Sequence, residues 1–129
     1  MNIKKYYRLN TREIRYILKT RKKFFIKWKL LNINFIDQYT DKYYNKFWIW
    51  ISSKFSKKAV YRNNVRRIFF DIIYKKWYFN KKIDWNFKKI YVTLRKDILF
   101  NVNEDCFIGK IKENIIDDLN TLFNFIYKK

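Results

Sequence analysis

The chain has 129 residues, and its 31 Lys and Arg residues against 11 Asp and Glu residues give a net charge of +20. This length predicts a single domain, residues 1–129, with one hydrophobic core. A hydrophobic content of 49% argues against an intrinsically disordered chain. The positive charge predicts a polyanionic partner, with nucleic acid ahead of an acidic membrane surface.

Residue types that are rare or missing narrow the function classes further. Cys106 is the only cysteine and there is no histidine. These absences exclude a disulfide within the chain, a zinc site and His-based acid–base catalysis. No run of about 18 apolar residues is present, which argues against a membrane span. The basic N-terminus lacks the apolar core of a signal peptide, so we expect a cytoplasmic protein.

The first predicted element is a helix over residues 11–19. Asn10 followed by Glu13 forms a capping-box pattern at its start. The apolar stripe of this helix consists of Ile14, Ile17 and Leu18. A basic line on another face consists of Arg12, Arg15 and Lys19.

Three stretches show the alternation of strands. Residues 22–36 alternate but change phase at Leu30-Leu31, which predicts either a bulged strand or a bend into a second short strand. Residues 47–52 are apolar on both faces, which predicts a central strand. Residues 89–96 predict a strand with Tyr91, Thr93 and Arg95 outward and with Ile90, Val92 and Leu94 inward.

Two longer helices are predicted over residues 57–77 and 110–127, the first followed by a basic connector, 78–88. The apolar back of the first consists of Val65, Ile68, Phe69, Ile72 and Ile73. The core stripe of the second consists of Ile111, Ile115, Leu119, Leu122, Phe123 and Ile126. Its outer side is expected to carry Glu113, Asp117 and Asp118, facing away from a polyanion.

The front of the helix over 57–77 is the strongest functional signal. Arg62, Asn63, Arg66 and Arg67 span an arc of about 140° on an ideal helix, and arginine is suited to gripping phosphate with two parallel hydrogen bonds. No acid lies four residues from Arg62 or Arg66. The same stripe continues into aromatic residues that either stack on RNA bases or pack on a neighbouring loop: Phe70, Tyr74 and Trp77. A solvated basic surface remains the alternative interpretation of the arginines.

This stretch resembles the RNR region of the protein subunit of bacterial ribonuclease P. Ser53 and Lys54 match the opening of that motif, and its centre is matched by Ala59, Val60, Arg62, Asn63, Arg66 and Arg67. The Arg8-Leu9 pair resembles the Arg-Leu before the first helix of that family. Departures from the motif occur at Phe55, Lys57, Asn64, Phe70 and Asp71.

The predicted elements and the resemblance agree on an α+β fold. Periodicity gives a single-sheet α/β sandwich of order α-β-β-(β)-α-β-α, with the fourth strand supplied by the bent segment. The resemblance implies a ribosomal-protein-S5-like topology with a left-handed βαβ crossover. General base rates favour the right-handed form, and the sequence pattern itself does not reveal handedness.

The resemblance also implies a divided function. The family's RNA subunit cuts precursor tRNA with Mg²⁺ held mainly by RNA, and the protein is an accessory subunit that binds. The expected partners are therefore ribonuclease P RNA and precursor tRNA. The chain itself shows no convincing catalytic or metal-ligating set. The RNA-binding residues expected by resemblance are Arg8, Lys54, Lys57, Lys58, Arg62, Asn63, Arg66 and Arg67.

The family binds the single-stranded 5′ leader of precursor tRNA in a cleft between the first helix and the sheet. The corresponding positions fall near Ile14, Leu18 and Trp28, and ordinary core packing is the competing interpretation of all three. Three other functions stay open: a general RNA-binding protein, such as a ribosome-associated protein or RNA chaperone; a cationic membrane-surface protein; and, least favoured, a nuclease acting alone.

Overall fold

The computed structural model describes residues 7–21, 23–27, 31–38, 42–51, 59–83, 85–94 and 107–124. Its elements in chain order are α1 (Thr11–Lys19), β1 (Phe24–Lys27), β2 (Leu31–Asp37), β3 (Lys46–Trp50), α2 (Ala59–Lys75), the 3-10 helix η2 (Tyr78–Asn80), β4 (Lys88–Leu94) and α3 (Phe107–Phe123). The predicted α+β order is therefore confirmed, including the fourth strand.

The four strands form one mixed sheet in the order β1-β2-β4-β3. β1 pairs antiparallel with β2, with Ile26 opposite Ile33, so the bend into a second strand is the correct alternative for residues 22–36. β2 pairs antiparallel with β4, whereas β3 and β4 are parallel. β3 is therefore the outermost strand, and the prediction of a central strand over 47–52 is wrong.

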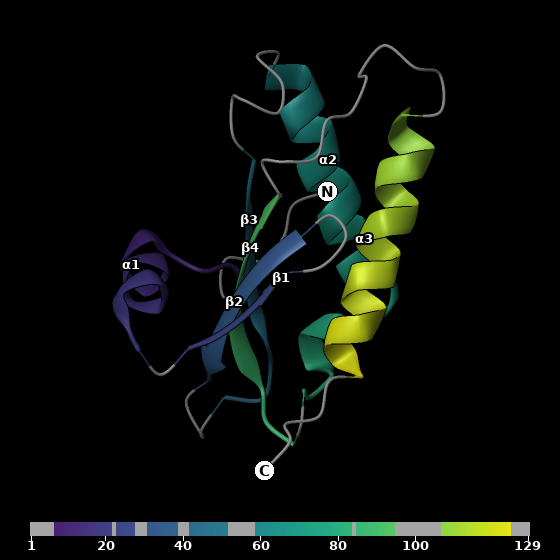
Figure 1. The fold of residues 1–129 in the computed structure, drawn as a ribbon. Coiled ribbons are helices and arrows are strands. Elements are labelled where there is room, and N and C mark those ends of the chain that lie inside the picture. Colours follow the sequence, from purple (N-terminus) through teal and green to yellow (C-terminus); the bar gives the residue numbers. More distant parts are fainter. Residues whose placement is uncertain are drawn as a thin grey trace.

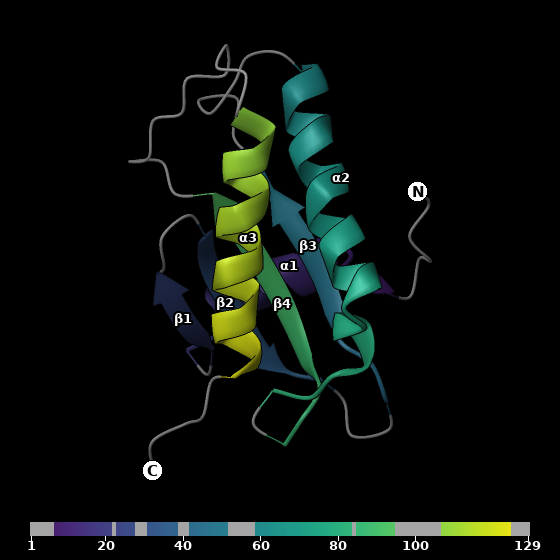
Figure 2. The ribbon, with the colours of Figure 1, turned by 90° about the vertical axis from the view of Figure 1, so that its right-hand side faces the viewer.

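The parallel pair β3 and β4 is joined through α2 by a left-handed crossover. In Figure 2, α2 lies in front of the sheet, both strands run upward, and β4 lies to the left of β3. A right-handed unit seen from this side would move to the right. About 98% of such crossovers are right-handed, so the resemblance was a better guide here than the general rule.

The main core lies between one face of the sheet and the pair α2 and α3, while α1 lies on the other side of the sheet (Figure 1). The sheet residues that contribute to it include Ile33, Phe35, Phe47, Ile49, Ile90 and Val92. The helix residues that contribute to it include Val65, Phe69, Ile72, Ile73, Ile111, Ile115, Leu119 and Leu122. These are the predicted apolar stripes of the two long helices; Ile126 lies outside the described residues.

The opposite face of the sheet packs against α1. The capping box at its start is present: Asn10 Oδ1 accepts from the Glu13 N–H at 2.8 Å, and Glu13 accepts from the Asn10 N–H at 3.1 Å. Ile17 is fully buried and clusters with Leu9 and Tyr91. Tyr91 was expected to point outward, and it is instead buried because α1 covers its side of β4.

Two further expectations are corrected by residues that are buried in the structure. Asp118 is buried, not on the outer side of α3, and its carboxylate accepts from the Leu31 N–H at 3.0 Å. This bond satisfies the first N–H of β2 and ties α3 to the sheet. The connector over 78–88 is also more than a basic loop, since Tyr78 and Phe79 in η2 are buried against the core.

Candidate nucleic-acid interface

The polar front of α2 combines one anchored arginine with more accessible neighbours. The Arg66 guanidinium carbon lies 5.3 Å from the ring centroid of Trp48, and its Nη1 donates to Asn63 Oδ1 at 3.1 Å. Arg67 and Asn63 are exposed, whereas Arg62 is half-buried. α2 thus brings together the four predicted residues, and packing on an indole fixes the position of Arg66, which lowers the entropy cost of ordering it on a ligand.

Trp48 connects this helix front to the α1 side of the sheet. It lies in β3, the edge strand, and its ring is 5.9 Å from that of Phe70. Phe70 is consequently buried and does not present a ring to a ligand. The aromatic stripe of α2 is therefore divided. Phe70 packs inward, as the alternative to RNA stacking predicted, although its partner is a strand and not a loop. Tyr74 and Trp77 are exposed.

The other predicted RNA-binding residues fall into two groups. Arg8 is exposed and forms a parallel bridge with Phe47, which places it next to the edge strand β3. Lys54, Lys57 and Lys58 lie outside the described residues, as does Trp28. Their predicted roles therefore stay predictions.

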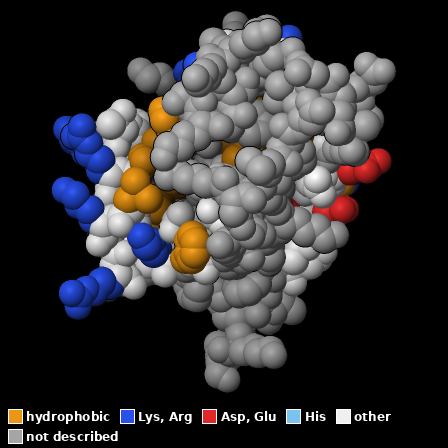
Figure 3. All heavy atoms as spheres, turned by 45° about the horizontal axis from the view of Figure 1, so that its top comes forward, with side chains coloured by type: hydrophobic (Ala, Val, Ile, Leu, Met, Phe, Trp, Pro, Cys, Tyr) orange, Lys and Arg blue, Asp and Glu red, His pale blue; other side chains and the backbone are white. Residues whose placement is uncertain are grey.

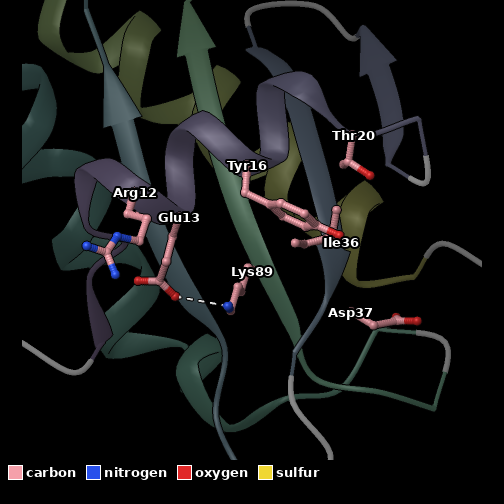
Figure 4. Close-up of a pocket in the computed structure, with 7 residues that line it drawn as sticks. All are labelled: Arg12, Glu13, Tyr16, Thr20, Ile36, Asp37 and Lys89. Carbon is pink, nitrogen blue, oxygen red and sulfur yellow. Dashed lines mark ion pairs between the residues drawn. The ribbon is translucent and has the colours of Figure 1, made fainter.

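A cleft of about 450 Å³ lies between α1 and the end of the sheet. Its lining is supplied by α1 and the chain just after it, β2 and β4, and consists of Arg12, Glu13, Tyr16, Thr20, Ile36, Asp37 and Lys89. Figure 4 shows the Tyr16 ring extending across the cleft toward Ile36, with Arg12 at one end and Asp37 at the other. With 57% of its surface exposed, Tyr16 has a ring face accessible to a planar ligand.

Glu13 anchors α1 to the floor of this cleft. Its carboxylate forms ion pairs with Lys46 Nζ at 3.0 Å and with Lys89 Nζ at 3.1 Å (Figure 4 shows the latter). Burial raises the pKa of Glu13, but the hydrogen bond from the Asn10 N–H and those from Lys46 and Lys89 outweigh burial, so the pKa is lowered from 4.5. Among the residues that line the cleft, Arg12 and Lys89 balance Glu13 and Asp37, and Lys46 adds a positive charge beside Glu13.

Ile14 and Leu18, the two predicted leader-binding residues that the structure describes, do not line the cleft. Ile14 is half-buried against the cluster of Leu9, Ile17 and Tyr91, and Leu18 is 48% exposed but is not in the cleft lining. Sequence reasoning missed Tyr16 as the aromatic residue of the cleft. The signal was present, because Tyr16 follows Arg12 by four residues and therefore shares its helix face.

Charge is segregated across the described surface. Figure 3 shows Lys and Arg side chains on the side of α1 and Asp and Glu side chains on the side of α3. The exposed basic residues of α1 are Arg12, Arg15 and Lys19, and the exposed acidic residues of α3 are Glu113 and Asp117. The α1 side therefore presents mainly basic side chains to a polyanion, with Asp37 as an exposed acid in the cleft.

The described residues contain neither a candidate metal site nor a candidate membrane-spanning helix. No three Cys, Asp or Glu side chains gather in a way that could hold a metal ion. No helix there combines the length and the apolar character that a bilayer crossing requires.

Neither a family model nor a curated protein matches the sequence. Several solved structures do match the fold. The Staphylococcus aureus RNase P protein is 17% identical, with 92% of this chain and 98% of that chain covered and a TM-score of 0.66. The Thermotoga maritima RNase P protein is 22% identical, with 93% and 98% covered and a TM-score of 0.66. A second S. aureus RNase P protein structure is 19% identical, with 99% and 100% covered and a TM-score of 0.59. Over nearly its whole length, this divergent chain has the fold of the bacterial ribonuclease P protein.

Proposed function

We propose that this chain is the protein subunit of ribonuclease P. It binds the catalytic RNA and the 5′ leader of precursor tRNA, and it thereby assists maturation of the tRNA 5′ end. The observation that carries the proposal is the cleft in which an exposed Tyr16 lies beside Arg12, between α1 and the sheet of a ribonuclease P protein fold. It agrees with the RNR-like sequence that forms the front of α2.

The front of α2 is proposed to hold the catalytic RNA. Arg62, Arg66 and Arg67 neutralise backbone phosphates, and the exposed amide of Asn63 adds a hydrogen-bonding group beside them. Lys54, Lys57, Lys58 and Arg8 extend the same basic surface in the proposal. Each phosphate contact contributes about 0.7–0.9 to the slope of log affinity against log salt, so binding weakens steeply with salt.

The cleft between α1 and the sheet is proposed to hold the leader. An unpaired base stacks on Tyr16, and the exposed Arg12 attracts an adjacent phosphate. The proposed leader site thus includes Tyr16 beside the predicted Ile14, Leu18 and Trp28. Stacking accepts any base, so the leader is held without strong sequence preference, and precursor tRNA binds better than mature tRNA.

Catalysis in this proposal belongs to the RNA. The Mg²⁺ of the reaction is assigned to the RNA subunit, as the resemblance to ribonuclease P proteins implies. The role of the protein is to bind, to neutralise charge and to position the substrate.

The test is the affinity of the reconstituted holoenzyme for precursor tRNA and for mature tRNA, measured with wild-type chain and with Tyr16→Ala. Because stacking contributes about 1–3 kcal/mol per base, the variant should lose about 5- to 100-fold in precursor affinity and nothing in mature tRNA affinity. Tyr43→Ala, which removes a 75% exposed ring outside the cleft lining, is the matched control.

Two results would count against the proposal. An equal loss for both tRNAs would show that Tyr16 does not contact the leader. A chain that binds RNA in general, with no preference for a precursor and no assembly with the catalytic RNA, would instead support the general RNA-binding alternative.

A further inference from the structure

A group of exposed aromatic residues lies beyond the arginines of the α2 front, at the end of that helix, and outside the lining of the α1 cleft. Trp77 is 75% exposed and Trp85 is 84% exposed, and Tyr74 in the last turn of α2 is also exposed. We define the end patch as Tyr74, Trp77, Trp85, Lys76, Lys81 and Lys82. Figure 2 shows the chain from the end of α2 to the start of β4 at the lower end of the molecule, away from the upper end where α2 begins.

Both tryptophans of the end patch have backbone conformations that other residues adopt more easily. Trp77 has φ 60° and ψ 28°, and Trp85 has φ 79°; they are the two non-glycine residues with positive φ in the described chain. Glycine or asparagine is the usual residue at such positions, because a Cβ atom is unfavourable there. Neither indole gains burial in return, so the folded chain alone gives no reason for tryptophan at either position.

The segment that presents these rings is firmly anchored. Asn45 is fully buried, and its Nδ2 donates to the carbonyls of Tyr78 at 2.7 Å and Lys81 at 2.6 Å. Ile83 is also fully buried and exchanges backbone hydrogen bonds with Asn86 on the far side of Trp85. The exposed indoles therefore project from a rigid support, which lowers the entropy cost of stacking on them.

The charge around the rings points to an anionic ligand. Residues 74–86 contain four lysines and one acid. The ammonium groups of two exposed lysines lie near rings of the same segment: Lys81 Nζ is 5.7 Å from the centroid of Tyr78, and Lys82 Nζ is 5.7 Å from that of Phe87. A surface of accessible flat rings between positioned cations matches a strand of alternating bases and phosphates.

We propose that the end patch is a second binding surface for single-stranded RNA, separate from the front of α2 and from the α1 cleft. Unpaired bases stack on Trp77 and Trp85, and Lys76, Lys81 and Lys82 contact the phosphates between them. Recognition does not depend on base identity, because every base offers a ring face. This proposal goes beyond the proposed function and does not require it.

The experiment is fluorine NMR of the full chain labelled with 5-fluorotryptophan, titrated with a ten-nucleotide uridine RNA. The chain has five tryptophans, and the signals of two are assigned with Trp77→Gly and Trp85→Gly. Both signals should shift in a saturable way. Inorganic polyphosphate of similar charge should leave them nearly unmoved, because it has phosphates but no bases.

Affinity measurements on variants separate the contribution of the aromatic rings from that of the positive charges. The Trp77→Gly/Trp85→Gly variant should bind the uridine RNA about 10-fold more weakly at moderate salt, while its thermal midpoint stays at or above that of wild type because glycine suits both positions. Trp77→Tyr/Trp85→Tyr keeps two aromatic rings and should retain affinity within about 3-fold.

Several outcomes would overturn the proposal. These are unchanged uridine-RNA affinity in the double glycine variant, equal shifts with polyphosphate, and shifts with anionic phospholipid vesicles but not with RNA. The Arg62→Ala/Arg67→Ala variant, altered only on the front of α2, should keep the RNA-induced shifts. Failure of the ribonuclease P proposal therefore leaves this test valid.

Discussion

Asn45 shows how one buried amide can join three segments of the fold. Its Oδ1 accepts from the Lys88 N–H at 2.6 Å, while its Nδ2 donates to the carbonyls of Tyr78 and Lys81. These bonds join the starts of β3 and β4 to η2 and to the segment that carries the end patch. Its fully buried position gives these backbone groups no water as an alternative partner.

Replacing Asn45 should therefore be costly. Asn45→Ala leaves the buried Tyr78 carbonyl, the part-buried Lys81 carbonyl and the buried Lys88 N–H without this partner, and we expect the free energy of unfolding to fall by about 3 kcal/mol. Urea denaturation followed by circular dichroism measures this change. Asn80→Ala, at an exposed position of η2, is the control and should change stability by less than about 0.5 kcal/mol. Similar small effects for both variants would contradict the role given to Asn45.

Glu13 predicts how stability depends on pH. Its pKa in the folded chain is below 4.5, so its stabilising contribution is fully present above pH 4.5 and is lost as the pH falls through the folded value. Glu13→Gln should be less stable than wild type at neutral pH, and the difference should shrink below pH 4.5. Urea midpoints between about pH 3 and 7 test this, with Glu113→Gln on the exposed side of α3 as control. A constant difference across that range would contradict the ion-pair account.

At the scale of elements, two substitutions to glycine near the end of α2 should change the stability of the fold in opposite directions. Trp77→Gly relieves a positive φ just after the helix and should raise stability by about 1 kcal/mol. Tyr74→Gly, three residues earlier inside the helix, should lower stability by about 0.5 kcal/mol. Thermal unfolding of both variants measures the pair. A loss of stability in Trp77→Gly would mean that its indole contributes packing that its exposure does not indicate.

Helices were more predictable than strand positions. The bounds of α1 follow from its capping box because that signal is local, and the buried stripes of α2 and α3 follow from helical spacing. β3 was misplaced in the sheet because two apolar faces resemble a central strand. Its second apolar face is instead explained by Trp48, which packs against Phe70 and the α1 cluster. Asp118 was misassigned because nothing near it in sequence reveals its partner, Leu31, 87 residues away.

The candidate sites were predictable to different degrees. The polar front of α2 is contained in one helix, so spacing alone brings Arg62, Asn63, Arg66 and Arg67 together. The cleft combines α1 with β2 and β4, and only the packing angle of α1 decides that Tyr16, and not Leu18, lines it. The exposed Trp77 and Trp85 depend on backbone angles that helical periodicity does not encode.

At the scale of the whole molecule, the left-handed crossover decides where the basic helix lies. It places α2 beside β3, and Arg66 of α2 contacts Trp48 of that edge strand, whose ring also packs against the α1 cluster. The two proposed RNA surfaces are thus linked through one tryptophan, while the acidic side of α3 lies away from α1 (Figure 3). One RNA–protein complex could therefore use both surfaces together.

The central claim is the subunit role, and the most direct measurement is cleavage of precursor tRNA at low Mg²⁺ by ribonuclease P RNA from the same genome, with and without this chain. We expect clear stimulation by the wild-type chain. It should be retained in Lys112→Ala, on the exposed side of α3, and largely lost in Arg66→Ala/Arg67→Ala. Absence of stimulation by a folded chain that still binds RNA would contradict the subunit role and leave a general RNA-binding protein in its place.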